Sequence, residues 1–250
     1  MPAVETSGLT KRYGDVVALD DLSLSVPEGE LFGLLGPNGS GKTTTIEILT
    51  GQRTPTEGTV SVLGRDPVAD PLAVREQVGI LPEREDPPSF LTAREYLQFV
   101  GDVRDVPDVD DRIEEWARKF EFRGVLDTLA GDLSEGERQR VMLSQTFVHD
   151  PDLVFIDEPL VNLDPLMQET VKRHLREYCA AGNTLFLSTH FMAVAEELCT
   201  KVGIIVDGSL VAEREPQALE EGQLLDAFVN EVEGASAAVD RGQPVEVGDE

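Results

Sequence analysis

The stretch ELFGLLGPNGSGKTTTIEILTG, residues 30–51, decides the fold. It begins with a largely apolar run, Glu30–Gly36, which is typical of a strand buried on both faces. It ends with Thr43–Gly51, where the pattern predicts a helix terminated by glycine. Between the two lies GPNGSGKT, Gly36–Thr43, which matches the spacing G-x-x-x-x-G-K-[ST]. A strand, a glycine-rich turn and a helix in this order predict a phosphate-binding loop.

The residue types of this turn indicate its chemistry. Glycines let backbone N–H groups wrap around phosphate oxygens, and the N-terminus of the next helix adds a partial positive charge. We expect Lys42 to reach the β- and γ-phosphates of a nucleotide and Thr43 to bind Mg²⁺. A chance match in a glycine-rich turn is the weaker interpretation, because a strand and a helix flank the motif. The predicted nucleotide-binding residues of this loop are Gly36, Pro37, Asn38, Gly39, Ser40, Gly41, Lys42, Thr43 and Thr44.

A second motif, LVFIDE at Leu153–Glu158, lies much further along the chain. Four apolar residues predict a buried strand that ends in two adjacent carboxylates, Asp157 and Glu158. Because side chains alternate along a strand, we expect the two carboxylates to turn to opposite sides. Asp157 would then hold Mg²⁺ while Glu158 faces the γ-phosphate and polarises a water molecule. Two surface acids at a strand end are the alternative in so acidic a chain.

Strands alternate with helices outward from these two motifs. Strands are expected at 16–26, 57–63, 184–189 and 202–208, and the segment 85–150 is helical in character, with Thr92 and Asp110 as predicted N-caps. In the second of these helices, four apolar residues fall on one face: Ile113, Trp116, Ala117 and Phe120. This alternation predicts an α/β fold with a mostly parallel sheet and helices on both faces.

We therefore expect a single domain over residues 1–232. Its core would comprise 1–84 and 151–215, its helical subdomain 85–150 and its C-terminal helix 216–232. The small and acidic residues of 233–250 predict a disordered tail.

The net charge of −27 arises from 21 basic and 48 acidic side chains. A surface this acidic repels nucleic acid and anionic lipid, so neither is expected as a direct partner. Cys179 and Cys199 lie in no Cys/His array, and we expect core residues in a reducing cytoplasm. The sequence shows no basic-then-apolar leader and no run of about 18 apolar residues. Any membrane part is expected to come from another chain.

Taken together, the motifs resemble those of the ABC ATPase family over nearly all of residues 4–230. They occur in the family's order: Tyr13 in KRYGD, GPNGSGKT, ILPE at Ile80–Glu83, LSEGERQR at Leu133–Arg140, LVFIDEP, NLDP at Asn162–Pro165 and STH at Ser188–His190. The resemblance implies a P-loop NTPase fold with a RecA-like, mostly parallel sheet. It also implies an N-terminal antiparallel β subdomain and an inserted α-helical subdomain.

The resemblance further implies a head-to-tail dimer, expected to be a homodimer, with two ATP molecules between the subunits. Tyr13 would stack on adenine, unless it is an ordinary core or surface tyrosine. Ser134 and Gly136 would bind the γ-phosphate of the ATP held by the other subunit, and Asp164 would lie at the dimer interface. The implied catalytic residues are Glu158, His190, Lys42 and Glu83, and the implied Mg²⁺ ligands are Thr43, Asp157 and Glu83. His149 and His174 belong to no motif and are expected to be structural.

Two positions depart from the family pattern. Glu83 stands where a glutamine is usual, so it can approach Mg²⁺ but has no N–H to donate. LSEGE replaces the common LSGGQ and places Glu135 and Glu137 near the incoming ATP. Two like charges about 4 Å apart cost about 4 kcal/mol at an effective dielectric near 20. We therefore expect Glu135 to point to solvent, leaving Ser134 and Gly136 for the phosphate.

The function predicted from these residues is that of a transporter motor that hydrolyses ATP and drives a separate membrane permease. The ILPE variant and the GRDP turn favour the short exporter-type ATPases, at the inner face of the cell membrane. A soluble ABC ATPase, such as an iron–sulphur assembly factor, is the alternative. A nucleotide-binding regulator without turnover is disfavoured because Lys42, Asp157, Glu158 and His190 are all present.

The charge pattern also resembles that of proteins from halophilic organisms with a salt-filled cytoplasm. Lysine is scarce, with 5 Lys against 16 Arg, and Asp and Glu are dense throughout 70–160 as well as in the tail. An ordinary acidic cytosolic protein with an acidic tail is the alternative. The halophile interpretation predicts a protein that works best in molar salt.

Overall fold

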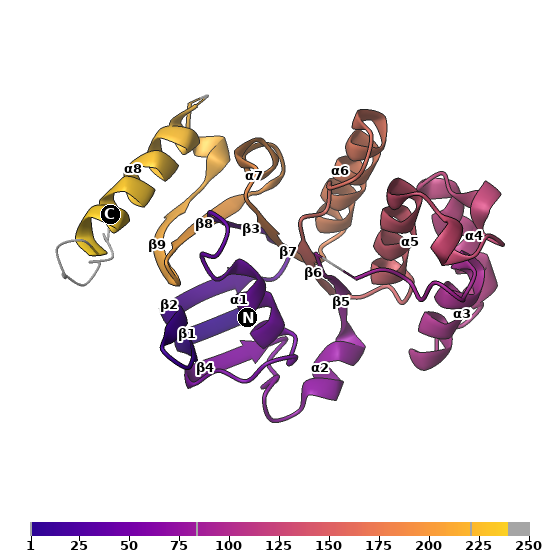
Figure 1. The fold of residues 1–250 in the computed structure, drawn as a ribbon, viewed down its shortest axis with the longest axis horizontal. Helices are drawn as coiled ribbons and strands as arrows, with labels where there is room; N and C mark the ends of the chain where they lie inside the picture. The colour runs from indigo at the N-terminus through magenta and orange to yellow at the C-terminus, as the bar shows by residue number, and fades with distance from the viewer. Residues whose placement is uncertain (1, 84, 221, 240–250) are drawn as a thin grey trace.

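The computed structural model describes residues 2–83, 85–220 and 222–239, which form two sheets and a group of helices (Figure 1). An antiparallel sheet has the order β2-β1-β4 and is made of β1 (Pro2–Tyr13), β2 (Val16–Pro27) and β4 (Glu57–Val62). A six-stranded sheet has the order β5-β6-β7-β3-β8-β9. Its strands are β3 (Leu31–Leu35), β5 (Val78–Leu81), β6 (Leu153–Asp157), β7 (Thr184–Thr189), β8 (Lys201–Val206) and β9 (Ser209–Arg214).

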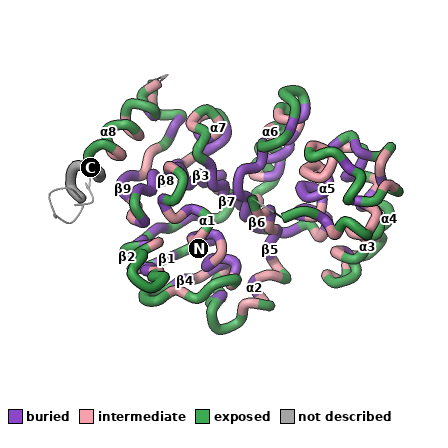
Figure 2. Tube along the Cα trace, viewed as in Figure 1, coloured by how far each residue is buried: buried purple, intermediate pink, exposed green. Residues whose placement is uncertain are grey.

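The six-stranded sheet is parallel except for its edge strand β9, which pairs antiparallel with β8. Every residue of β3, β6 and β7 is buried, as their apolar runs predict, and Figure 2 shows this buried centre. The register places Asp157 beside Ser188 and Leu35 beside Thr189. The carboxyl ends of β3, β6 and β7 therefore meet at one edge of the sheet, where α/β folds bind their ligands.

Among the described residues, five helices belong to the part of the molecule that contains the two sheets. They are α1 (Lys42–Leu49), α2 (Pro71–Gln77), α6 (Pro165–Ala180), α7 (Met192–Leu198) and α8 (Gln223–Val239). A helical subdomain contains α3 (Ala93–Val103), α4 (Val109–Lys119) and α5 (Glu135–Phe147). Short 3-10 turns occur at Arg123–Val125, Ala130–Asp132 and Pro216–Ala218. In Figure 1 this subdomain lies at the end of the molecule opposite α8. The predicted fold class is thus confirmed.

The cap of α3 is confirmed and that of α4 is corrected. The Thr92 side chain accepts a hydrogen bond from the backbone N–H of Glu95 and caps α3 as predicted. The residue preceding α4 is Asp108, with φ of 51°, and Asp110 lies in the first turn, where a carboxylate favours the helix dipole. The predicted apolar face of α4 is buried, and its members are Ile113, Trp116, Ala117 and Phe120.

The C-terminal region differs from the prediction in two ways. The final helix begins at Gln223, after the 3-10 turn at Pro216–Ala218, rather than at Pro216. It continues to Val239, so the expectation of a disordered tail is wrong for 233–239. The remainder of that predicted tail, 240–250, lies outside the described residues. The subdomain boundaries drawn at 85 and 150 stay a prediction.

His174 lies on α6 at the contact between the core and the helical subdomain. Its ring is within 6 Å, centroid to centroid, of three aromatic rings, those of Trp116 (5.0 Å), Phe120 (5.7 Å) and Phe147 (4.7 Å). Neither ring nitrogen has a hydrogen-bond partner in the part of the chain that the structure describes. Burial, with a smaller effect of Lys119, lowers the pKa of His174 to about 3. The histidine expected to be structural is therefore a neutral part of an aromatic cluster.

This buried histidine should make the protein sensitive to acid. The unfolded chain binds a proton at His174 near pH 6.5, whereas the folded chain does so only near its lowered pKa. The free energy of unfolding should therefore fall by about 2 kcal/mol between pH 7 and pH 5 from this residue alone. Urea unfolding at both pH values, at one KCl concentration, should show a smaller loss in His174→Phe. An equal loss in the wild type and the variant would contradict this assignment.

Candidate functional site

The glycine-rich loop that joins β3 to α1 has a shape that requires glycine. Gly39 and Gly41 have φ values of 81° and 107°, which L-residues with side chains rarely adopt. A Cβ on Gly36 would clash with the carbonyl oxygen of Ile205 on β8. The loop therefore depends on glycine at these three positions, and it leads directly into the N-terminus of α1.

Lys42, the first residue of α1, is buried beneath this loop. Its Nζ donates hydrogen bonds to the carbonyl oxygens of Gly36 (2.8 Å) and Pro37 (3.0 Å). Burial lowers the pKa of Lys42, and the nearby carboxylates of Glu158, Asp157 and Glu83 oppose that shift. The ammonium group thus lies where the loop and three carboxylates converge, as expected for a residue that neutralises phosphate charge.

Asp157 at the end of β6 is held by two hydroxyl groups. Its Oδ2 accepts a hydrogen bond from Thr43 Oγ1 (2.8 Å), and its Oδ1 accepts one from Ser188 Oγ on the neighbouring β7. Burial raises the pKa of Asp157, and these two hydrogen bonds offset part of the shift. The paired oxygens of Thr43 and Asp157 are hard ligands of the kind that Mg²⁺ prefers.

Mg²⁺ fits these residues only together with phosphate oxygens or water. Among the described residues, no group of three or more His, Cys, Asp or Glu side chains could hold a metal ion. Mg²⁺ commonly takes one or two protein oxygens and completes its shell with substrate phosphates and water. The predicted set of Thr43 and Asp157, with Glu83 in the same cavity, agrees with such a partial shell.

Glu158 follows β6 and is fixed by the end of β7. Its φ is 54°, so the residue is no longer part of the strand, and strand alternation does not determine its direction. Its Oε2 accepts a hydrogen bond from Thr189 Oγ1 (3.0 Å), and its Oε1 accepts one from the backbone N–H of His190 (2.9 Å). His190 Nδ1 lies 2.6 Å from the same Oε1. The side chain of Glu158 is therefore buried and oriented from two directions.

One cavity of about 290 Å³ brings most of the predicted site residues together. Asp157 and Glu158 both line it, so the expected separation to opposite sides is replaced by two carboxylates that face one space. The cavity is lined by Ala18, Asn38, Gly39, Gly41, Lys42, Thr43, Thr44, Glu83, Asp157, Glu158 and His190. The buried Ser40 lies in the same loop.

Tyr13 does not line this cavity. It ends β1 and is 41% exposed, and Lys11 Nζ and Arg53 Cζ lie 5.0 and 5.6 Å from the centroid of its ring. Arg53 also forms an ion pair with Glu47. The side chain is thus partly exposed, and two cations lie over its ring, so its predicted stacking on adenine stays a prediction.

Ser134 and Gly136 lie at the N-terminus of α5, which belongs to the helical subdomain (Figure 1), and neither residue lines the cavity. Ser134 and Glu135 are both exposed in the single chain, so the direction of Glu135 relative to a partner's ATP stays a prediction. A Cβ on Gly136 would lie 3.0 Å from the carbonyl oxygen of Asn162, which follows Glu158 in the same chain. Within one chain, these two predicted phosphate-binding residues therefore do not share the cavity that Lys42 lines.

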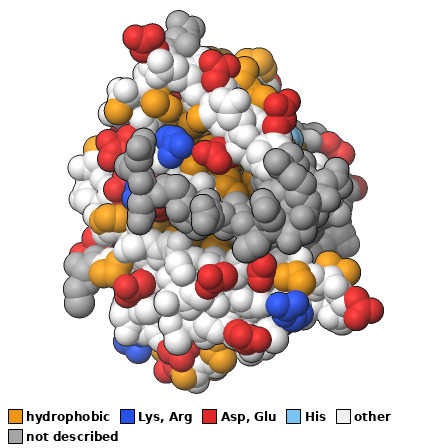
Figure 3. Space-filling view, turned by 90° about the vertical axis from the view of Figure 1, so that its left-hand side faces the viewer, with side chains coloured by type: hydrophobic (Ala, Val, Ile, Leu, Met, Phe, Trp, Pro, Cys, Tyr) orange, Lys and Arg blue, Asp and Glu red, His pale blue; other side chains and the backbone are white. Residues whose placement is uncertain are grey.

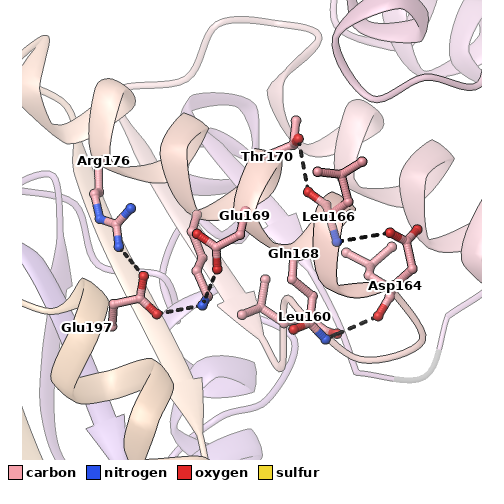
Figure 4. Close-up of polar contacts among 10 residues, drawn as sticks. Leu160, Asp164, Leu166, Gln168, Glu169, Thr170, Arg176 and Glu197 are labelled. Carbon is pink, nitrogen blue, oxygen red and sulfur yellow. Dashed lines mark hydrogen bonds and ion pairs between the residues drawn. The ribbon is translucent and has the colours of Figure 1, made fainter.

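Asp164 gives the segment after Glu158 a defined shape, drawn in Figure 4. Its Oδ1 accepts hydrogen bonds from the backbone N–H groups of Leu166 (3.0 Å) and Met167 (3.1 Å), which caps α6. Gln168 Nε2 donates to the carbonyl oxygens of Leu160 (3.2 Å) and Leu163 (3.1 Å). In the same view Glu197 accepts hydrogen bonds from Arg176 (2.5 Å) and Lys172 (2.5 Å), which ties α7 to α6.

Two supporting residues carried no role in the sequence analysis. Ser188 and Thr189 were quoted there only as letters of STH, yet their hydroxyls hold the carboxylates of Asp157 and Glu158. The signal for them was their place at the end of a buried strand, because the carboxyl ends of parallel strands lie side by side.

The model of the ABC transporter family matches residues 19–161, more than half of the chain. The chain belongs to this family. It is 35% identical to the Nod factor export ATP-binding protein I of Rhizobium sp. (strain N33), over 87% of this chain and 72% of that protein. It is 36% identical to the proteins of the same name from Ralstonia nicotianae and Mesorhizobium japonicum, over 68% and 64% of their lengths and 87% of its own.

Solved structures agree with this assignment. One described as the ATP-binding subunit of an ABC transporter superposes with a TM-score of 0.84 at 28% identity, over 91% of this chain and 99% of that chain. A cassette solved as a dimer in a post-hydrolysis state with ADP and Pi gives 0.79 at 24% identity, over 85% and 98%, which supports the fold. The ABC protein described here is thus an ATP-binding and ATP-hydrolysing subunit of a transporter.

None of the helices in the described ranges combines the length and the apolar character that crossing a bilayer requires.

Proposed function

We propose that this ABC ATPase is the motor of an exporter and acts as a homodimer on a separate membrane permease, at the cytoplasmic face. The observation that carries the proposal is the division of the predicted site. Lys42, Asp157 and Glu158 share one cavity, whereas Ser134 and Gly136 lie on another subdomain. A second copy in a head-to-tail arrangement would complete each cavity. The relatives named above are export proteins, which favours export as the direction.

Within one subunit the residues take distinct roles. Lys42 and the loop N–H groups bind the β- and γ-phosphates, and Tyr13 stacks on the adenine ring. Thr43 and Asp157, with Glu83 nearby, would hold Mg²⁺, and the bound ion would supply positive charge beside the transferred phosphoryl group. Glu158 accepts a proton from the attacking water, and His190 keeps the carboxylate in place and contacts the γ-phosphate. The hydrogen bonds from Thr189 and His190 support this orientation of Glu158.

The surface around the cavity supports a second copy as the partner. Three large apolar side chains are exposed next to the catalytic segments: Val161 (37%), Leu166 (74%) and Phe191 (47%). Val161 and Leu166 flank the Asp164 cap, and Phe191 follows His190 directly. Exposed apolar side chains beside a charged site are typical of a protein interface. We assign this surface, together with Asp164, to the dimer.

A different surface is proposed for the permease. A second cavity of about 400 Å³ shares Thr43, Glu83 and Asp157 with the first and extends to Glu85. The segment that follows it pairs with the helical subdomain, since Ala130 N–H donates to the carbonyl oxygen of Leu91 (2.8 Å). Phe90 on this segment is 75% exposed. A partner seated here would sense the Mg²⁺ residues through Glu83.

The test of this function separates transport from ATP turnover. Phe90→Ala should abolish transport in vesicles that contain the ATPase and its permease. The ATPase rate of the isolated subunit should stay within about twofold, because Phe90 is not among the residues that line the nucleotide cavity. Leu225→Ala is a matched control, since Leu225 is also exposed (50%) but lies on α8 at the other end of the molecule. Equal loss of transport and turnover would indicate misfolding and remove support for this surface.

A further inference from the structure

The N-terminus of α5 is closed by three reciprocal hydrogen bonds between Ser134 and Glu137. Ser134 Oγ donates to Glu137 Oε2 (2.7 Å), and the backbone N–H of Ser134 donates to the same oxygen (2.8 Å). In return, Ser134 Oγ accepts from the backbone N–H of Glu137 (3.3 Å). The carboxylate of Glu137 therefore occupies both hydrogen-bond donors of Ser134.

This arrangement leaves Ser134 without a donor for a phosphate. A serine hydroxyl has one proton, and here that proton is directed at Glu137. A γ-phosphate from a partner could accept it only after the carboxylate has moved away. Hydrogen bonds to a carboxylate are stronger than those between neutral groups, and the displaced charge would also repel the phosphate.

Arg140 offers the Glu137 carboxylate a second position. Arg140 lies one turn further along α5, and its guanidinium is held close by, with Nε donating to the carbonyl oxygen of Gly136 (3.1 Å) and Nη1 to that of Glu121 (3.0 Å). Its charge acts on Glu137, whose pKa is lowered first by the hydrogen bonds from Ser134 and further by Arg140. Residues three apart on a helix are neighbours, so a rotated Glu137 would remain paired.

We propose that Glu137 is a gate on Ser134: it blocks the hydroxyl until ATP-driven closure of the dimer displaces the carboxylate toward Arg140. The proposal rests on the head-to-tail dimer proposed above. Glu137 is a positioning residue, because it acts on the phosphate through Ser134. The energy needed to open this gate weakens dimer closure and lets bound ATP persist in separate subunits.

The chain contains a matched control for this idea. At the N-terminus of α3, Thr92 Oγ1 and the backbone N–H of Thr92 both donate to Glu95 Oε2 (3.0 and 2.8 Å), and the backbone N–H of Glu95 donates back to Thr92 Oγ1 (3.1 Å). The geometry matches that at Ser134, yet Thr92 belongs to no nucleotide motif. Replacing Glu95 or Glu137 with glutamine thus removes the same charge from the same kind of helix cap.

The experiment measures ATP-dependent dimerisation by sedimentation in the Glu158→Gln background, where hydrolysis is suppressed. Adding Glu137→Gln should lower the dimer dissociation constant by about tenfold or more, because a neutral amide holds the hydroxyl less strongly and does not repel phosphate. The change should be largest at low salt and shrink in molar KCl, where charges are screened. Glu95→Gln should leave the constant unchanged at every salt concentration.

The outcomes separate the two proposals. If the Glu158→Gln parent forms no dimer with ATP, the proposed function fails and the gate fails with it. If the parent dimerises and Glu137→Gln does not tighten the dimer, only the gate is overturned. An equal effect of Glu95→Gln would show that helix capping in general, not release of Ser134, changes the constant, and would also overturn the gate. Melting temperatures measured on all variants exclude loss of folding as the cause.

Discussion

Glu158→Gln should reduce ATP turnover by about 10²- to 10⁴-fold, the usual contribution of a positioned general base. The amide cannot accept the proton of the attacking water. Its oxygen can still accept the hydrogen bond from the backbone N–H of His190, and its NH2 group can donate to the hydroxyl of Thr189, so the local geometry survives. ATP binding should persist because Lys42, Thr43 and Asp157 are untouched. Phosphate release measures turnover, and sedimentation with ATP should show a stable dimer.

Lys42→Ala provides the contrasting variant. It removes the ammonium group that the loop carbonyls of Gly36 and Pro37 hold in the cavity. We expect loss of ATP affinity, seen by calorimetry, and therefore no ATP-dependent dimer. Near wild-type hydrolysis by Glu158→Gln would refute the assignment of Glu158 as the base.

Molar KCl should raise both the melting temperature and the ATPase rate. The net charge is −27, and Figure 3 shows acidic side chains spread over the face it presents, with few basic ones among them. At 0.1 M salt the Debye length is about 10 Å, whereas at 1 M it is about 3 Å, so most of the repulsion disappears. A gain of about 3 kcal/mol would raise the melting temperature by roughly 10 °C in a chain of this size.

The rate should respond more than the stability, because in the proposed dimer two polyanionic subunits would have to meet around two ATP molecules. Scanning calorimetry and phosphate release between 0.1 and 3 M KCl, concentrations spanning roughly the 10 Å to sub-3 Å screening range, test both effects. Sucrose at matched osmolality is the control, since it favours compact states without screening charge. A protein that is most stable and most active near 0.1 M salt would exclude the halophile interpretation and leave the ATPase assignment intact.

The central strands could be predicted from sequence because their apolar runs are local signals. The segments Leu31–Leu35, Leu153–Asp157 and Thr184–Thr189 are buried on both faces. The first is followed by Gly36, and the other two end in polar residues. By contrast, β1 is long, irregular and rich in polar residues, and its pairing with both β2 and β4 contains register shifts. The short β5 is defined by its pairing with β6 rather than by its own pattern.

The residues of the candidate site could be predicted from the sequence, but the hydrogen bonds among them could not. The order of motifs placed Lys42, Asp157 and Glu158 together, since parallel strands end at one edge of a sheet. The roles of the Ser188 and Thr189 hydroxyls could not be predicted, because the residues next to them in the sequence do not indicate a hydrogen bond to the neighbouring strand. The hydrogen bonds between Glu137 and Ser134 depend on the rotamers of both side chains. The spacing of the two residues in the sequence allows these rotamers but does not require them.

The closeness of Gly136 to the carbonyl oxygen of Asn162 bears on how two active centres in a pair would communicate. In the proposed dimer, the end of α5 that each subunit would present to its neighbour's nucleotide lies against the segment that follows its own Glu158. A movement of that segment during one hydrolysis event would press directly on the element that grips the other nucleotide. Signalling between the centres would then need only a single backbone contact in each chain, and the two turnovers would be coupled events rather than independent ones.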